Sequence, residues 1–249
     1  LYSSAILNKD GTVLSVGYNG YGELGIGNYY NQSLVKTMQR SQMDGVFRGV
    51  IDLDRNDHHG VFATLEWNEK TGSFDNYVYA TGYGYEGITT AGVGNSYRYN
   101  QYPVRAIGAD GKPITEISQV SAAYRTHIAL TNGNANVYVW GHNNAGQHGN
   151  GTVNGSVDKD KIPSAVKQSS SSSDDLSDIM LISGGDTANH SNGTHIVTAS
   201  KSGGVLVWGS NNRYQLGNRT NENSAYPVVV GSSPLTLNKN IVRVNLKAN

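Results

Sequence analysis

The residues with the clearest potential for chemistry are the acidic run at 52–57, Asp-Leu-Asp-Arg-Asn-Asp. Carboxylate and amide oxygens at alternate positions are typical of the start of a calcium-binding loop. That loop needs glycine at its sixth position and glutamate at its twelfth, where this sequence has Asp57 and Ala63. His58 and His59 follow, but neighbouring residues of a strand point to opposite faces and are poor joint metal ligands. The sequence therefore predicts no metal site.

A second string with chemical potential is Gly-Tyr-Gly-Glu-Leu-Gly at 20–25, which has the spacing of a phosphate-binding loop. A phosphate cradle also needs a helix after the glycines or a following Lys-Ser/Thr pair, and neither pattern is present. No serine–histidine–acid set, paired-carboxylate signature or cofactor fingerprint stands out. The absence of cysteine excludes thiol chemistry and disulfides. We therefore expect no catalytic residue, no cofactor and no enzymatic activity.

A group of tyrosines in the second quarter of the chain is the best candidate for binding. Tyrosine provides a rigid surface that is partly apolar and partly polar, and it is enriched at protein interfaces. Ordinary loop packing is the alternative explanation for the same residues. The predicted binding residues are Tyr83, Tyr85, Tyr97, Tyr99 and Tyr102.

Composition restricts the partners that such a surface would have. The 249 residues include 19 Lys+Arg and 19 Asp+Glu, so there is no net charge and no basic stripe for nucleic acid. No apolar run approaches the roughly 18 residues of a membrane span. We expect a protein partner or self-association. Low charge with abundant Tyr, Asn and Ser favours an extracellular or cell-surface location, and a cytoplasmic location is the alternative.

The elements that must position these residues recur about four times. Gly17, Gly82, Gly141 and Gly209 each end an apolar strand and lie 65, 59 and 68 residues apart. Turns such as Asp-Gly and Asn-Gly, which favour hairpins, precede that strand. A four-stranded unit needs roughly 40–50 residues, so these units must carry inserted loops. One such insertion, the serine run at 169–173, is predicted to be a solvated, mobile loop.

Each unit is predicted to contain four strands and no amphipathic helix. In the third unit a strand at 128–130 is followed by one at 137–140, and a proline-containing strand and a closing strand come later. The predicted fold class is therefore all-β, in one domain with approximate repeats 1–58, 59–126, 127–194 and 195–249. Residues that recur at matching places are predicted to be structural: His127, His195 and a third candidate His59, Trp140, Trp208, and the marker glycines Gly17, Gly82, Gly141 and Gly209.

These segments resemble the regulator of chromosome condensation repeat family. The family pattern is an apolar strand after a histidine, then Val-Tyr-x-Trp-Gly, Asn-x-x-Gly-Gln-Leu-Gly and a later Pro-x-x-Val. Segments 127–149 and 195–217 match most closely and 6–27 nearly as well, whereas the second segment has Ala80-Thr81-Gly82 in place of Trp-Gly. The resemblance implies a β-propeller of four-stranded blades, about four of them here, in which the recurring histidine is structural. Family members usually have seven blades.

The two ends of the sequence complement each other. Residues 241–249 read as the strand before a histidine strand, and residues 2–7 read as the strand that would follow. Either the termini together complete one blade, or the chain is part of a larger propeller or array; the second interpretation is favoured. We expect a non-enzymatic binding or scaffold module that presents loops for protein interaction or assembly, within a larger surface or extracellular protein. The alternative implied by the resemblance is a guanine-nucleotide exchange factor for a Ran-like small GTPase, and an enzyme ranks last.

Overall fold

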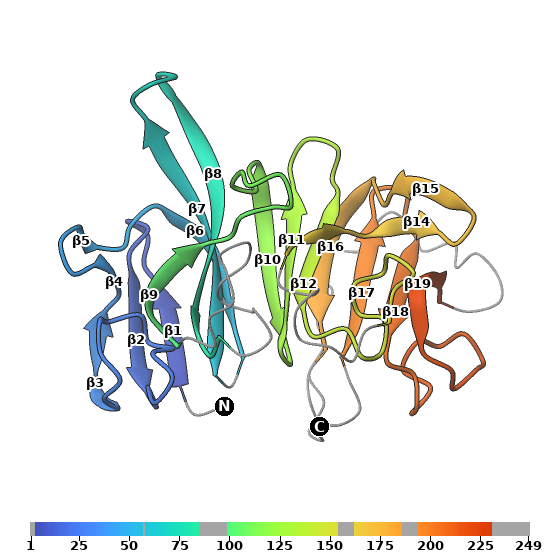
Figure 1. Cartoon of the computed structure of the whole chain (residues 1–249), viewed down its shortest axis with the longest axis horizontal. Coiled ribbons are helices and arrows are strands. Elements are labelled where there is room, and N and C mark those ends of the chain that lie inside the picture. The colour runs from blue at the N-terminus through green and yellow to red at the C-terminus, as the bar shows by residue number, and fades with distance from the viewer. Residues whose placement is uncertain (1–2, 57, 85–98, 154–161, 186–193, 231–249) are drawn as a thin grey trace.

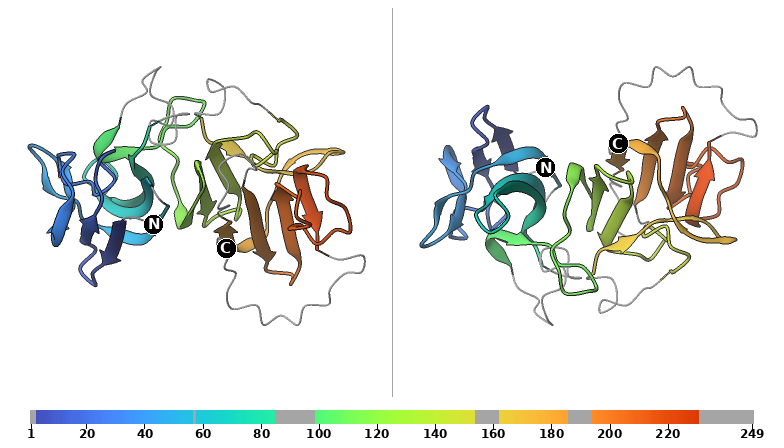
Figure 2. Two further views of the ribbon diagram at one scale, coloured as in Figure 1. Left: turned by 90° about the horizontal axis from the view of Figure 1, so that it is seen from below. Right: turned by 90° about the horizontal axis from the view of Figure 1, so that it is seen from above.

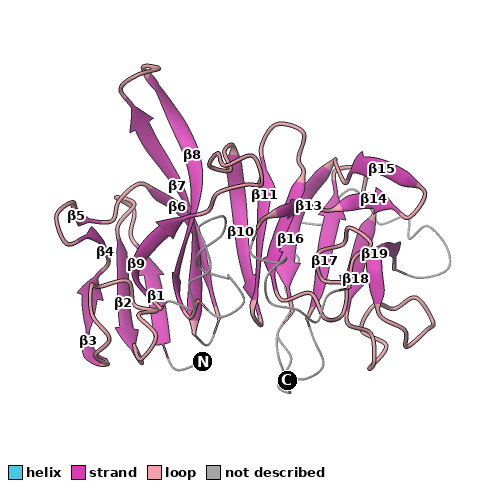
Figure 3. Ribbon diagram, in the orientation of Figure 1, coloured by secondary structure: helices cyan, strands magenta, loops and turns pink. Residues whose placement is uncertain are grey.

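The computed structural model describes residues 3–56, 58–84, 99–153, 162–185 and 194–230. Within these ranges every helix or strand element is a β-strand (Figure 3). Gly, Asn and Asp in tight turns and alternating apolar residues in the strands account for this all-strand structure. The all-β prediction is confirmed.

The described strands form four blade-like antiparallel sheets that follow one another across the molecule in chain order (Figure 1). The first blade has three described strands: β1 (Ser3–Leu7), β2 (Val13–Gly17) and β3 (Gln32–Thr37). The second has β6 (Val50–Arg55), β7 (His59–Asn68), β8 (Ser73–Gly82) and β9 (Asn100–Arg105). The third has β10 (Ile117–Ala123), β11 (Thr126–Thr131), β12 (Val137–Gly141) and β13 (Ser164–Ala165). The fourth has β16 (Ile179–Gly184), β17 (His195–Ser200), β18 (Val205–Gly209) and β19 (Ser224–Val229).

Two small hairpins supplement the blades. They are β4 (Gln39–Ser41) with β5 (Gly45–Val46), and β14 (Lys167–Ser169) with β15 (Ser172–Asp175). The second hairpin contains the serine run for which a solvated loop was predicted; the run is solvent-accessible, but its ends form paired strands instead of a loop. An ion pair of 2.6 Å between Lys167 Nζ and Asp175 Oδ1 joins the two strands. Serine is a weak strand former, and the pairing that orders it here is not visible in local composition.

The blades are offset by one strand from the predicted repeats. Residues 117–123 fall within the predicted second repeat at 59–126, but they form β10, the first strand of the third blade, where β10 pairs with β11. A tight turn at Tyr124 and Arg125 joins β10 to β11, and antiparallel strands joined by such a turn pair with each other. Seen from either end of the strands, the sheets lie next to one another (Figure 2).

The first strands of successive blades are connected by side chains that accept hydrogen bonds from the next backbone. Asp52 and Asp54 of β6 accept hydrogen bonds from backbone N–H groups of β10. In the same way, Gln119 and Ser121 of β10 accept hydrogen bonds from backbone N–H groups of β16. Burial raises the pKa of both aspartates, while the backbone bonds oppose that rise. The acidic run therefore links blades. The bonds are Val120 N to Asp52 Oδ2 (2.8 Å), Ala122 N to Asp54 Oδ2 (2.9 Å), Ile182 N to Gln119 Oε1 (2.7 Å) and Gly184 N to Ser121 Oγ (3.0 Å).

The core lies between the blades, and the two recurring tryptophans fill it. Trp140 of the third blade is fully buried in a cluster with Val61 and Val78 of the second. Trp208 of the fourth blade is fully buried in a cluster with residues of the third, and its indole Nε1 donates to the Gln147 carbonyl at 2.7 Å. Burial of a whole indole contributes several kcal/mol, about 3–5 by the cost of truncation to alanine. The tryptophans thus serve blade packing.

The marker glycines share a backbone conformation that side chains disfavour. Their φ angles are 110° at Gly17, 95° at Gly82, 104° at Gly141 and 99° at Gly209. At the last three, an added Cβ would contact the carbonyl oxygen of the residue just before the partner strand, which is His58, Arg125 and Thr194 respectively. The residue after each of these three donates its backbone N–H to the same carbonyl, at 2.7–2.9 Å. Glycine recurs there because no other residue fits without strain.

The histidines differ from the predicted common position. His59 and His195 lie opposite Gly82 and Gly209, whereas His127 lies opposite Trp140, one residue further along its strand. Six residues separate the last paired residues of β11 and β12, and five separate those of β17 and β18, which shifts the register by one. As a result His127 faces the second blade, where its Nε2 lies 2.7 Å from His59 Nδ1.

Candidate functional site

Two of the five predicted binding tyrosines come together beside the first blade. Tyr83 and Tyr99 stack with ring centroids 5.6 Å apart, and Tyr21 meets each of them edge-on at 5.0 Å. Tyr18 and His58 complete this tyrosine cluster around Tyr21. Aromatic pairs in these geometries stabilise each other by about 0.5–1.5 kcal/mol beyond burial. The cluster is therefore ordered, not a loose set of loop side chains.

The other three predicted tyrosines are not part of the described cluster. Tyr85 and Tyr97 lie outside the described residues. Tyr102 lies on β9, where its hydroxyl fills the space that a Cβ at position 27 would need. Tyr18 and Tyr21 were missed in the sequence, although they follow Gly17 just as Tyr83 follows Gly82. Alignment of the turns after the marker glycines would have revealed them.

One turn beside the cluster departs from the repeat pattern. In the third and fourth blades, Gln147 and Gln215 each accept a backbone N–H with Oε1 and donate with Nε2 to an asparagine side chain. The first blade has Glu23 at this place and Gly20 where the asparagine would be. The hydrogen bond to the backbone is kept in the first blade, because Glu23 Oε2 accepts the Tyr21 N–H at 2.9 Å.

The second oxygen of Glu23 is in an unusual environment. Glu23 is fully buried, and among the described residues its Oε1 has no hydrogen-bond partner. The nearest opposite group is His58 Nδ1 at 4.0 Å, and the buried guanidinium of Arg55 donates to the Glu23 carbonyl. Burial raises the pKa of Glu23 to about 7, because the effect of burial is larger than the lowering caused by the positive charge of Arg55. A cavity of about 260 Å³ adjoins His58, Tyr21 and Tyr83.

A pair of exposed aromatic rings lies elsewhere, on the β7–β8 hairpin. Both strands have ten residues, compared with five or six in β11, β12, β17 and β18. The extra length projects beyond the neighbouring blades (Figure 1). Cross-strand pairing continues to Asn68 and Ser73, so the projection is a continuous two-stranded ribbon.

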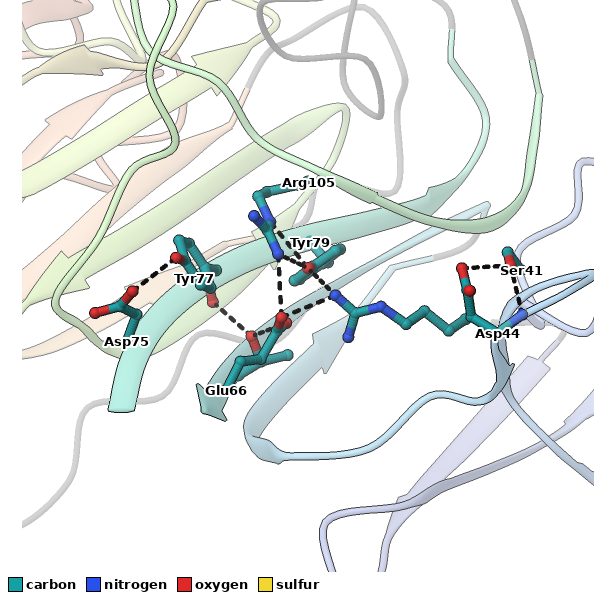
Figure 4. A network of polar contacts seen from close by, with 9 residues as sticks. Ser41, Asp44, Glu66, Asp75, Tyr77, Tyr79 and Arg105 are labelled. Atoms are coloured by element: carbon teal, nitrogen blue, oxygen red, sulfur yellow. Dashed lines mark hydrogen bonds and ion pairs between the residues drawn. The ribbon is translucent and has the colours of Figure 1, made fainter. Parts of the chain in front are cut away.

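A polar network supports one face of this hairpin (Figure 4). Glu66 of β7 accepts hydrogen bonds from Arg40 of β4 at 2.8 Å and from Arg105 of β9 at 3.0 Å. The same two arginines donate to the Tyr79 hydroxyl, at 2.8 and 2.6 Å. Burial works to raise the pKa of Glu66, but the bonds from Arg40 and Tyr79 lower it overall. Four side chains on four strands therefore hold the hairpin base in one position.

The network extends outward along the same face. The Arg105 guanidinium lies over the Tyr77 ring, 3.9 Å from its centroid, and the Tyr77 hydroxyl donates to Asp75 at 2.9 Å. Asp75 in turn accepts from Asn68 across the hairpin at 2.7 Å. A two-stranded ribbon is marginally stable alone, and these contacts stiffen it.

The opposite face of the projecting part is apolar and uncovered within the described structure. Trp67 and Phe74 are a cross-strand pair with ring centroids 5.1 Å apart. They are 56% and 60% exposed, and Leu65 beside them is 37% exposed. We call these three residues the hairpin apolar face. Trp67 is not followed by glycine, unlike the two tryptophans of the repeat pattern. This difference was the feature of the sequence that could have indicated an exposed aromatic surface here.

The described residues set limits on metal and membrane sites. They contain no group of three His, Asp or Glu side chains placed to hold a metal ion. They also contain no helix that is long and apolar enough to cross a membrane.

Comparisons with known proteins agree with this architecture. Residues 202–245 match the profile described as Regulator of chromosome condensation (RCC1) repeat. Among solved structures, human WBSCR16 is 23% identical with a TM-score of 0.64, and the match covers 92% of this chain. Prp20p from Saccharomyces cerevisiae, a protein studied for its binding to Gsp1p and histones, is 13% identical with a TM-score of 0.64 over 93% of this chain. No curated protein sequence matches significantly.

The matched structures are about twice as long as this chain, which covers 49% of each. At these identities the likeness establishes the fold. Residues 202–245 carry one repeat of the regulator of chromosome condensation (RCC1) family, and the chain has the fold of about half of an RCC1-type propeller.

Proposed function

We propose that the chain is a non-enzymatic binding module that contacts a protein partner through the hairpin apolar face. The observation that carries this proposal is a pair of exposed aromatic rings, Trp67 and Phe74, on a supported projecting ribbon. Solitary exposed apolar residues are normal, but tryptophan is enriched among the residues that dominate interface energies. We further propose an extracellular or cell-surface location, which rests on composition alone.

The energetics of such a contact are favourable. Full burial of a large apolar side chain contributes about 1.5–3 kcal/mol, and because Trp67 and Phe74 are already partly covered, burial of their exposed parts would contribute about 2–3.5 kcal/mol together. The network around Glu66 already fixes the hairpin, so a partner would have little further ordering to impose on the chain. The same surface would serve self-association if the partner were a second copy.

The test is quantitative affinity capture from the source organism with three forms of the chain. The wild type is compared with Trp67→Ala/Phe74→Ala and with Tyr30→Ala, which removes a 76% exposed ring on the first blade. A partner should be captured by the wild type and Tyr30→Ala and be reduced at least tenfold with the double variant. Sedimentation of the same forms tests self-association. Equal capture by all three forms, with no change in sedimentation, would refute the proposal.

A second candidate function is nucleotide exchange on a Ran-like small GTPase. It is favoured by the fold shared with Prp20p, which is described as binding Gsp1p. A nucleotide-release assay with a Ran-like GTPase would decide it. Stimulated release at catalytic amounts of the chain would support exchange, and release at the intrinsic rate would exclude it.

A further inference from the structure

A wide cleft lies at the edge of the third blade, and none of its lining residues belongs to the hairpin apolar face or the tyrosine cluster. Its volume is about 720 Å³, within the range of small-molecule sites. Three segments enclose it: the connection at 108–116, the β11–β12 turn at 131–136 and the stretch at 162–165. Tyr138 of β12 also lines it.

The cleft walls are formed before any ligand arrives. Within the first wall, Gly108 donates its N–H to the Lys112 carbonyl at 2.8 Å, and Ile107 and Pro113 form an isolated bridge. The Asn132 N–H donates to the Glu116 carbonyl at 2.6 Å, which ties the first wall to the second. A ligand would therefore meet a preorganised surface, which lowers the ordering cost of binding.

Two residues of these walls are held in a conformation that non-glycine residues disfavour. Glu116 has a φ of 60° and Ala135 has a φ of 54°. Each left-handed residue costs about 1–2 kcal/mol, and such residues concentrate at functional sites. Glu116 itself lines the cleft, whereas Ala135 is buried in the core behind the second wall.

The lining is rich in neutral hydrogen-bonding groups. Hydroxyls come from Thr115, Thr131, Ser164 and Tyr138, and an amide comes from Asn134. No hydrogen bond of the Tyr138 hydroxyl or the Asn134 side chain is found to any described residue, and neither group is buried away from the cleft. These two side chains can therefore donate to and accept from a ligand.

The charges around the cleft disfavour an anion. Asp110 and Glu116 carry negative charge and Lys112 carries positive charge, so the lining has a net charge of −1 and contains no arginine. Burial raises the pKa of Tyr138, and the negative charges of Asp175 and Asp110 raise it further. A phosphate or carboxylate ligand would meet a negative potential without a guanidinium to bind it.

We propose that this cleft binds a neutral oligosaccharide. Sugar hydroxyls both donate and accept, which matches the mixed hydroxyl, amide and carboxylate lining, and the aliphatic surfaces of Pro113, Ile162 and Pro163 suit the apolar faces of sugar rings. A wholly apolar ligand would leave the polar groups of Asn134 and Tyr138 unsatisfied.

The test is calorimetric or NMR titration of the 249-residue chain with cellotriose, maltotriose and triacetylchitotriose. Sialyllactose, which is anionic, is titrated in parallel. Binding of at least one neutral trisaccharide with a dissociation constant of about 1 mM or tighter is expected. Tyr138→Phe and Asn134→Ala should each weaken it about fivefold, the effect of one neutral hydrogen bond. Tyr30→Phe and Trp67→Ala should leave it unchanged.

Three results would each overturn the proposal that the cleft binds a neutral oligosaccharide. No binding of any neutral trisaccharide up to about 10 mM, a range in which weak sugar sites are detectable, would overturn the proposal. Binding that survives both cleft variants would overturn it too, as would tighter binding of sialyllactose. Because Trp67→Ala tests the hairpin apolar face separately, loss of the partner contact leaves this result unaffected.

Discussion

Replacement of Glu23 by glutamine restores the residue that the third and fourth blades have at the same turn. The pKa of Glu23 is raised from 4.5 to about 7 by burial, so the carboxylate is less stable in the folded chain than in the unfolded chain. The difference of about 2.5 pKa units corresponds to about 3 kcal/mol. Because the folded pKa lies above the unfolded pKa, Glu23 lowers stability fully above pH 7, and this penalty disappears as the pH falls towards 4.5.

Glu23→Gln should therefore change the free energy of unfolding more favourably at pH 8.5 than at pH 4, by about 3 kcal/mol, because the cost of the unpaired Gln amide is the same at both pH values. Urea unfolding followed by tryptophan fluorescence at both pH values measures this. Gln215→Glu is the reverse control, but Gln215 is only half-buried and its hydrogen bonds are exposed, so its substitution should change stability much less at either pH. A Glu23→Gln gain that is equal at both pH values would refute the reasoning, because it would not follow the titration of the carboxyl.

Four further predictions concern the frame and the hairpin. Gly141→Ala should lower stability by about 2–4 kcal/mol in urea unfolding, since φ is 104° and the new Cβ meets a carbonyl oxygen; an unchanged midpoint would contradict this. Trp208→Phe should lower the free energy of unfolding by about 1–3 kcal/mol, because the bond to Gln147 is lost and the ring is smaller. An unchanged temperature of thermal unfolding would contradict this. Glu66→Gln should speed amide hydrogen exchange in the outer half of the hairpin above about pH 5, where the lowered pKa keeps the carboxylate charged, and exchange like that of wild type would exclude a bracing role. Burial lowers the pKa of His148 to about 4, so stability should be complete above pH 6.5 and fall by up to about 3 kcal/mol as the pH drops to 4; an NMR titration giving a pKa near 6.5 would contradict it.

The fold was largely predictable because its determinants are local. The glycines at 17, 82, 141 and 209 and the Asp-Gly and Asn-Gly turns fix where strands turn, and period-two patterns fix which side chains are buried. The offset between repeats and blades was not predictable in the same way. The local sequence does not decide whether the strand at 117–120 pairs with the strand before it or with the strand after it. The His127 register was not predictable either, because the segments 127–141 and 195–209 have the same length and differ only in which residues pair across the hairpin.

The candidate sites were harder to predict because they depend on distance in space. Tyr21 and Tyr83 are 62 positions apart in sequence and meet only through blade packing. The support of the hairpin needs Arg40, Glu66 and Arg105, which lie on three separate strands. Only departures from the repeat, Glu23 for glutamine and Trp67 outside any Trp-Gly motif, were visible in the sequence as signals of these places.

The most direct measurement of the central claim is site-specific photo-crosslinking in the source organism. A photoreactive phenylalanine analogue is placed at Trp67, and in a second form at Tyr30, which is also exposed but lies on the first blade. If the hairpin apolar face binds a protein, the analogue at position 67 forms one dominant crosslinked species and the analogue at position 30 does not. Absence of any crosslink at position 67, or the same products from both positions, would contradict the claim.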